Sequence, residues 1–118
     1  DRSPSRGLGD VYKRQQQETP ISKAWVRTYA EIGEEILDLR KLSVAISNDG
    51  KGYKDIKSEV YPVASKEDRN GIYTHELSFD TVQAHYVKIT ARPEYDIPTW
   101  HWGKGRPAFI FVDEIGLE

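Results

Sequence analysis

The feature that most constrains this chain is a set of short segments in which apolar and polar residues alternate. In residues 86–92, which read YVKITAR, every second residue is apolar: Val87, Ile89 and Ala91. Because successive side chains of a β-strand point to opposite faces, this spacing predicts a strand with one buried face.

Five further segments favour strands by the same reading. They cover residues 21–30, 42–46, 53–60, 72–79 and 108–117. Turn-forming residues separate several of them: Asn48, Asp49 and Gly50 first, then Asn70 and Gly71, then Asp80 and Thr81. Residues 31–40 have some helical spacing, but Gly33 and the lack of a cap favour a loop there.

Six strands with short turns and no convincing helix predict an all-β, antiparallel sandwich or barrel. Trp25 and Tyr29 lie on one face of the 21–30 strand, and we expect them in the core.

The bulk composition excludes several classes of partner. The 118 residues suffice for one domain, and the net charge of −2 does not attract nucleic acid. No apolar stretch is long enough to span a bilayer, so no membrane insertion is expected. Cysteine is absent, which excludes disulfides and thiolate sites.

The first fifteen residues differ from the rest, because they have no apolar periodicity and are rich in Gly, Ser and Arg. Residues 5–15, SRGLGDVYKRQ, resemble one reading frame of a transposon sequencing adapter. We therefore expect residues 1–15 to be a non-native, flexible tail and residues 16–118 to be the domain, without its own beginning.

Three motifs resemble discoidin-like (coagulation factor 5/8 type C) domains. They are SVAISNDGKGYKDI, NGIYTHELSF with AHYVKITA, and PTWHWGKGRPAFIFVDEIGLE. The last resembles the closing segment of such domains at the C-terminus of bacterial family-20 β-N-acetylhexosaminidases; Trp102 stands where a glycine is more usual there. The resemblance covers residues 21–118 and is weakest over residues 30–40.

The resemblance implies a discoidin-like jelly-roll β-sandwich, truncated at its N-terminus. It also implies a non-catalytic accessory domain of a secreted, periplasmic or cell-surface enzyme that degrades glycans. The expected partner is the catalytic domain of the parent chain, with a glycan as a possible second partner.

Residues 93–107 hold the best binding candidates, namely Trp100, His101, Trp102, Lys104 and Arg106. Aromatic faces stack on sugar C–H surfaces, and the flanking polar groups are suited to hold hydroxyls. The other interpretation, which the sequence favours, is that the tryptophans plug the end of the sandwich or pack against the catalytic barrel.

Asp113 and Glu114 resemble the adjacent acid pair of family-20 enzymes, but that pair belongs to a barrel of about 250 residues. On one strand the two side chains should point to opposite faces, so we expect an ion pair or a loop contact instead. His75, His85 and His101 lack metal-ligand spacing and are expected to be ordinary surface or rim residues. We predict no catalytic residue, no metal site and no cofactor.

Overall fold

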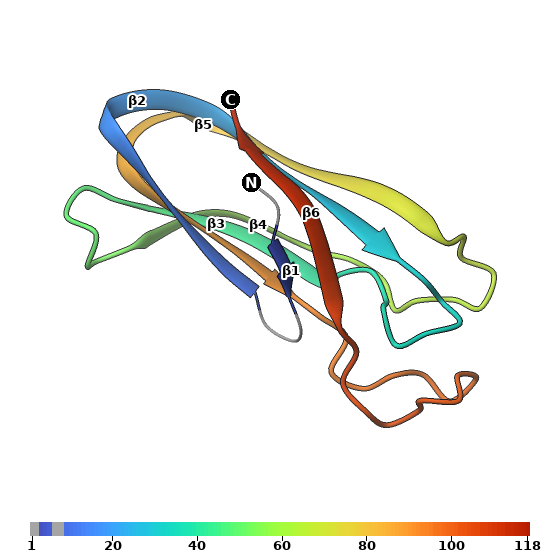
Figure 1. Ribbon diagram of the computed structural model, residues 1–118. Helices are drawn as coiled ribbons and strands as arrows, with labels where there is room; N and C mark the ends of the chain where they lie inside the picture. The colour runs from blue at the N-terminus through green and yellow to red at the C-terminus, as the bar shows by residue number, and fades with distance from the viewer. Residues whose placement is uncertain (1–2, 6–8) are drawn as a thin grey trace.

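Two long strands form the centre of the molecule. The computed structural model describes residues 3–5 and 9–118, with side chains described from residue 19 onward. Strands β2 (Gly9–Ala30) and β5 (Gly71–Arg92) run antiparallel along nearly their whole lengths. Their register shifts between Arg14 and Thr19 and again between Ile21 and Lys23, where both strands bend. The bend folds the sheet back on itself (Figure 1).

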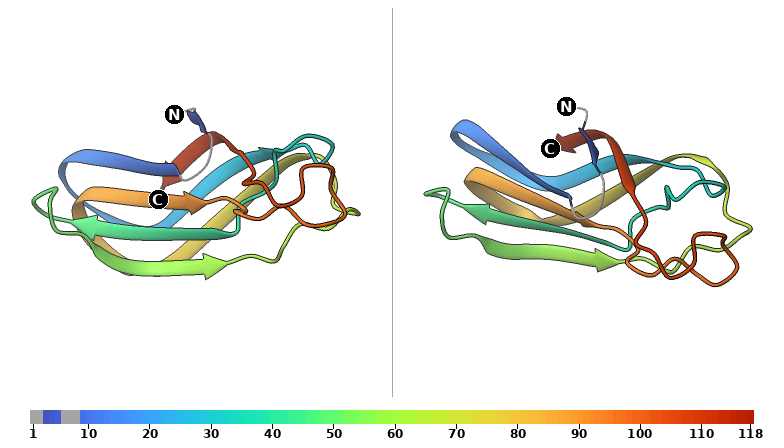
Figure 2. Two further views of the ribbon diagram at one scale, coloured as in Figure 1. Left: turned by 90° about the horizontal axis from the view of Figure 1, so that it is seen from below. Right: turned by 60° about the horizontal axis from the view of Figure 1, so that its bottom comes forward.

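Four shorter strands complete a six-stranded antiparallel sheet in the order β1-β6-β2-β5-β3-β4. They are β1 (Ser3–Ser5), β3 (Lys41–Ser47), β4 (Lys54–Val60) and β6 (Ile110–Leu117). Strands β3 and β4 extend the half of β5 near its C-terminal end, and β6 pairs with residues 24–29 of β2. The two halves lie over one another as the layers of a sandwich (Figure 2). No helix occurs in the described residues, so the all-β prediction is confirmed.

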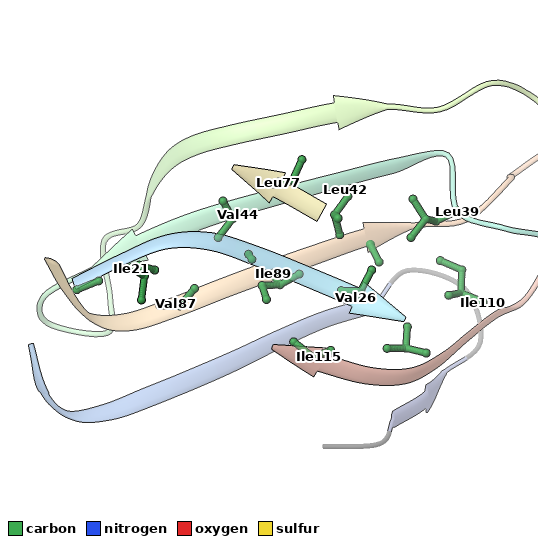
Figure 3. Close-up of a cluster of buried hydrophobic side chains, with 14 residues drawn as sticks. Ile21, Val26, Leu39, Leu42, Val44, Leu77, Val87, Ile89, Ile110 and Ile115 are labelled. Carbon is green, nitrogen blue, oxygen red and sulfur yellow. The ribbon is translucent and has the colours of Figure 1, made fainter. Parts of the chain in front are cut away.

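The core lies between these layers. Figure 3 shows Val26 of β2, Leu42 and Val44 of β3, and Val87 and Ile89 of β5 in one cluster. Their side chains are at most 2% exposed. A smaller cluster of Leu37, Ile97 and Ala108 lies under the loops at one end of the sandwich. The alternation noted in residues 86–92 is therefore the burial pattern of β5.

The turn at residues 47–52 follows the predicted chemistry. Gly50 has φ 78°, and its N–H donates to Ser47 Oγ at 2.9 Å. The Asp49 carboxylate accepts from the N–H groups of Lys51 and Gly52, and these bonds together with that to Ser47 lower the pKa of Asp49. Side-chain and backbone groups thus satisfy one another where the β3–β4 hairpin reverses.

Three predictions about strands and core are wrong. Asp80 and Thr81 make no turn, because β5 continues through them while its main chain stays paired with β2. Trp25 and Tyr29 are half-exposed on the outer face, since Ala24, Val26 and Thr28 take the inward positions. Trp25 instead contacts Gly116, where a Cβ atom would come within 2.2 Å of the indole.

The described part of the first fifteen residues is not a free tail. Ser3–Ser5 pairs with Val112–Ile110, and Gly9–Arg14 pairs with Ala91–Tyr86. Strand pairing uses main-chain groups that every residue carries, so a segment without apolar periodicity can still occupy an open sheet edge. The adapter origin of residues 1–15 stays a prediction from the sequence.

Candidate functional site

Three connecting segments gather at the end of the sandwich opposite the β3–β4 turn (Figures 1 and 2). They are residues 31–40, 61–70 and 93–109, and we call this end the mouth. Binding residues concentrate on loops that a rigid scaffold positions, so the mouth is where a ligand site is expected.

The loop of residues 93–107 folds back on itself over the mouth. Ile97 is 1% exposed, its N–H donates to Arg106 O at 2.9 Å, and its carbonyl accepts from Gly105 N at 2.9 Å. Gly105 has φ 83°, a conformation that side chains disfavour. The loop is therefore held in a defined shape by its own backbone and one buried isoleucine.

His101 fixes this loop to the neighbouring turn of residues 31–36. Its ring Nε2 lies 2.7 Å from Ile32 O and 2.8 Å from Glu34 O, and Nδ1 lies 2.8 Å from Gly103 N. Carbonyls only accept, so Nε2 carries the proton and Nδ1 accepts from Gly103. At 5% exposure, with both nitrogens engaged, His101 is a positioning residue. The prediction that it is an ordinary surface or rim residue is wrong, because it is buried; the prediction that it holds a sugar hydroxyl stays a prediction, and the protein's own backbone already engages both ring nitrogens.

Trp102 is the most exposed ring of the loop, at 63%. Its Nε1–H donates to Gly33 O at 2.8 Å, which fixes the indole against the same turn. The guanidinium of Arg106 lies 5.2 Å from the indole centroid, within the range of a cation–π contact. Trp100 is 37% exposed, and Lys104 is exposed as well. We call Trp100, Trp102, Lys104 and Arg106 the platform.

Glu35 supports the platform from below. Its carboxylate lies 2.8 Å from Arg106 Nη2 and is largely buried, with 17% of the side chain exposed. A Cβ atom at residue 103 would come within 2.7 Å of that carboxylate, so Gly103 lets the loop approach Glu35 closely. The tryptophans do not plug the mouth, because Trp100 and Trp102 are exposed, whereas Ile97, Leu37 and Ala108 are buried there.

A separate pocket of about 440 Å³ opens at the mouth between the layers. We call it the inner pocket. Its polar side chains include Asp38, Tyr61, Asp68, Tyr73 and His75. The sequence did not predict this pocket, because its residues come from three separate segments. One signal was present: Tyr73 and His75 are alternate residues on the face of β5 that points inward.

The Asp38 carboxylate organises the inner pocket. It accepts from Thr28 Oγ1 and Leu39 N, both at 2.8 Å, and it lies 2.8 Å from His75 Nε2. His75 has 13% of its side chain exposed, so it is a half-buried residue of the pocket wall and not a free surface histidine. No group of three potential metal ligands occurs in the part of the chain that the structure describes.

Asp113 and Glu114 lie on the same face of β6, and both contact Arg27. Arg27 Nη2 is 2.6 Å from Asp113 Oδ2 and 3.4 Å from Glu114 Oε1, and the hydrogen bond with Asp113 raises the pKa of Arg27. The register of β2 and β6 shifts at this point, so a β-bulge turns both carboxylates outward. The prediction of opposite faces is wrong, whereas the prediction of an ion pair is confirmed.

An apolar patch lies on the same outer face. Ile72 is 63% exposed, Phe111 is 38% exposed, and the Tyr29 and Phe111 rings meet edge to face at 6.1 Å. The three side chains line a hollow of about 280 Å³ with Ile36 and Asp113.

Comparison with solved structures identifies the fold. A pectin-binding carbohydrate-binding module is 21% identical with a TM-score of 0.53, over 96% of this chain and 68% of that one. Chitosan-binding module 1 from a Paenibacillus chitosanase/glucanase is 12% identical with a TM-score of 0.56, over 96% and 71%. The C-terminal domain of a Bacteroides fragilis chitobiase is 14% identical with a TM-score of 0.48, over 94% of this chain and 65% of that one. This likeness is too distant to bear on parentage.

No protein-family model and no curated protein matches the chain. The described residues include no helix able to cross a membrane. Together, the antiparallel layers and the structural likeness show that the chain has the discoidin-like jelly-roll fold of carbohydrate-binding modules.

Proposed function

We propose that the chain is a non-catalytic, glycan-binding accessory module, which stacks sugar rings on the platform at its mouth. The observation that carries this proposal is the exposed indole of Trp102, which is held in place by its bond to Gly33 O. A fixed aromatic face binds a sugar ring with little loss of side-chain entropy on binding. Lys104 and Arg106 lie beside it as hydrogen-bond donors.

The enzyme that carries this module is part of the same proposal. The sequence resemblance favours a secreted, periplasmic or cell-surface β-N-acetylhexosaminidase, and the partner in the same chain is then its catalytic domain. The pairing of Asp113 and Glu114 with Arg27 supports a non-catalytic role, because both carboxylates are engaged in ion pairs on an outer face. Reading the adjoining coding sequence tests the parentage, and a neighbouring domain with no hydrolase barrel would contradict it.

Replacing Trp102 tests the platform. In titrations of the 118-residue chain with neutral, amino and acidic oligosaccharides, we expect Trp102→Ala to weaken binding about tenfold, or roughly 1.4 kcal/mol. Isothermal calorimetry measures this without relying on the fluorescence of the deleted indole. Trp102→Phe should retain part of the affinity, because it keeps an aromatic face but loses the bond to Gly33 O.

Trp25→Phe is the matched control, since Trp25 lies over Gly116 on the outer face and should not affect glycan binding. Wild-type affinity in Trp102→Ala, or no binding of any oligosaccharide by the wild-type chain, would contradict the platform.

Packing on the catalytic domain is the second candidate function, and the exposed patch of Tyr29, Ile72 and Phe111 favours it. Apolar side chains that gather on one outer face are typical of an interface. In the parent enzyme, Phe111→Ser should lower the unfolding temperature of the catalytic domain while oligosaccharide binding stays unchanged. An unchanged unfolding temperature would contradict this role.

A further inference from the structure

The inner pocket is built from segments that are distant in the sequence. Its walls come from the end of β2, the loop of residues 32–39, residues 61–68 after β4, and the start of β5. Its volume of about 440 Å³ lies within the range of small-molecule pockets, roughly 300–1,000 Å³. The space therefore suits one sugar ring and its substituents.

The polar groups of the pocket are held in place before any ligand arrives. Thr28 is 1% exposed, and its hydroxyl donates to Asp38 Oδ1. Because the Asp38 carboxylate only accepts, the proton shared with His75 resides on Nε2. Asp38 accepts three hydrogen bonds and has about four acceptor positions, so it retains capacity for one more donor.

Tyr61 provides a hydroxyl that the protein does not satisfy. Its Oη is buried and has no hydrogen-bond partner in the part of the structure described here. The centroids of the Tyr61 and His75 rings lie 4.6 Å apart, so the phenol ring forms part of the wall. Burial, with the charges of Glu59 and Asp38, raises the pKa of Tyr61 to about 12, which keeps the hydroxyl protonated as a donor. The hydroxyl is not accessible from the empty pocket, so it donates to a ligand only when the wall shifts on binding; because an unpaired buried hydroxyl costs free energy, a ligand that supplies an acceptor favours that shift.

The charges around the pocket select among sugars. Asp38 and Asp68 line it, whereas no lysine or arginine among the residues with described side chains does. A carboxylate-bearing sugar would meet like charge in a partly enclosed space, and an amino group would meet opposite charge and aromatic faces.

The inner pocket and the platform are separate sites that share a wall. Ile32 lines the pocket, while the carbonyls of Ile32 and Gly33 accept from His101 and Trp102 on the other side. The turn of residues 31–36 thus divides one site from the other.

We propose that the inner pocket is a second glycan-binding site, which takes a single neutral or amino sugar ring through Tyr61, Asp38 and His75. The choice of a sugar as the ligand rests on the proposed function, but the residues that line the inner pocket are not those of the platform.

The test uses methyl β-glucoside, methyl β-glucosaminide and methyl α-galacturonoside, added to the ¹⁵N-labelled 118-residue chain. We expect the first two to shift the backbone amide signals of Leu39, Ala64 and Ser65, and the galacturonoside to leave them in place. Tyr61→Phe removes only the hydroxyl and should weaken binding of the first two about fivefold. The melting temperature should stay the same or rise, because the lost hydroxyl had no protein partner.

Tyr53→Phe is the matched control, since Tyr53 lies beside the turn at the other end and should bind these sugars as the wild type does. Unchanged affinity in Tyr61→Phe, or shifts confined to the indole signal of Trp102, would overturn the inner pocket. Trp102→Ala measured in parallel separates the proposals: loss of oligosaccharide binding with retained methyl glucoside binding supports both, whereas the reverse pattern contradicts both.

Discussion

The two surfaces at the mouth have opposite character. The platform turns an indole outward and places Lys104 and Arg106 beside it, whereas the inner pocket is a partly enclosed space lined by Asp38, Asp68 and aromatic side chains. The same turn of residues 31–36 supports both. One rigid loop end can therefore present two sites that differ in charge and in depth, and the difference predicts different ligands.

The largest loss of stability is expected from replacing His101, which fixes the loop of the platform to the turn of residues 31–36. His101→Ala removes hydrogen bonds to the backbone at Ile32, Glu34 and Gly103, and it leaves those groups poorly satisfied. We expect the free energy of unfolding to fall by about 3 kcal/mol and binding at both sites to weaken. Urea denaturation measures the first effect. His85→Ala, on the half-exposed part of β5, should cost about 1 kcal/mol or less. If the two variants lose a similar free energy of unfolding, His101 does not support the two surfaces in the way proposed.

A charge reversal sharpens the contrast between the surfaces. Lys104→Glu should weaken binding of oligogalacturonate to the platform about fivefold, because it replaces attraction with repulsion near the indole. Binding of methyl β-glucosaminide in the inner pocket should change little, since the intervening turn separates the two sites. Lys57→Glu on β4 makes the same change in net charge away from the mouth. An equal loss in both lysine variants would show that only the overall charge matters.

The last prediction concerns how the stability of the fold declines at alkaline pH. The pKa of Tyr61 is raised from 10.0 to about 12, mainly by burial, so the folded state favours the protonated phenol. Its contribution to stability is fully present below about pH 10 and is lost as the pH rises through about 12. Tyr61→Phe should remove that part of the decline when melting is followed from pH 9 to 12. An identical alkaline decline in the variant would mean that the phenol is not buried in solution.

The strands were predictable because their signal is local. Alternation in residues 42–46 and 86–92 predicts β3 and the end of β5, and the hairpin turn at Gly50 follows from residues that tolerate positive φ. The bulge at Asp113 has a signal too, since the buried residues Val112 and Ile115 are three apart instead of two. By contrast, residues 71–92 form one continuous strand because they pair with β2 along its length. That pairing cannot be recognised from the local turn propensity at Asp80.

The candidate sites divide in the same way. The platform was predictable because Trp100, Trp102 and Arg106 are neighbours in one loop, although the loop alone does not distinguish the exposed Trp102 from the buried His101. The inner pocket was not predictable, because Asp38, Tyr61 and His75 meet only after the sheet has folded over.

By itself, the sequence determined that this chain forms antiparallel strands with polar loops between them, because side-chain alternation and turn chemistry act between close neighbours in the chain. Only the tertiary structure decided which aromatic rings face solvent, which carboxylates share Arg27, and which side chains enclose a pocket. Those outcomes depend on bends and register shifts between strands far apart in sequence, where one residue of displacement moves a side chain to the other face.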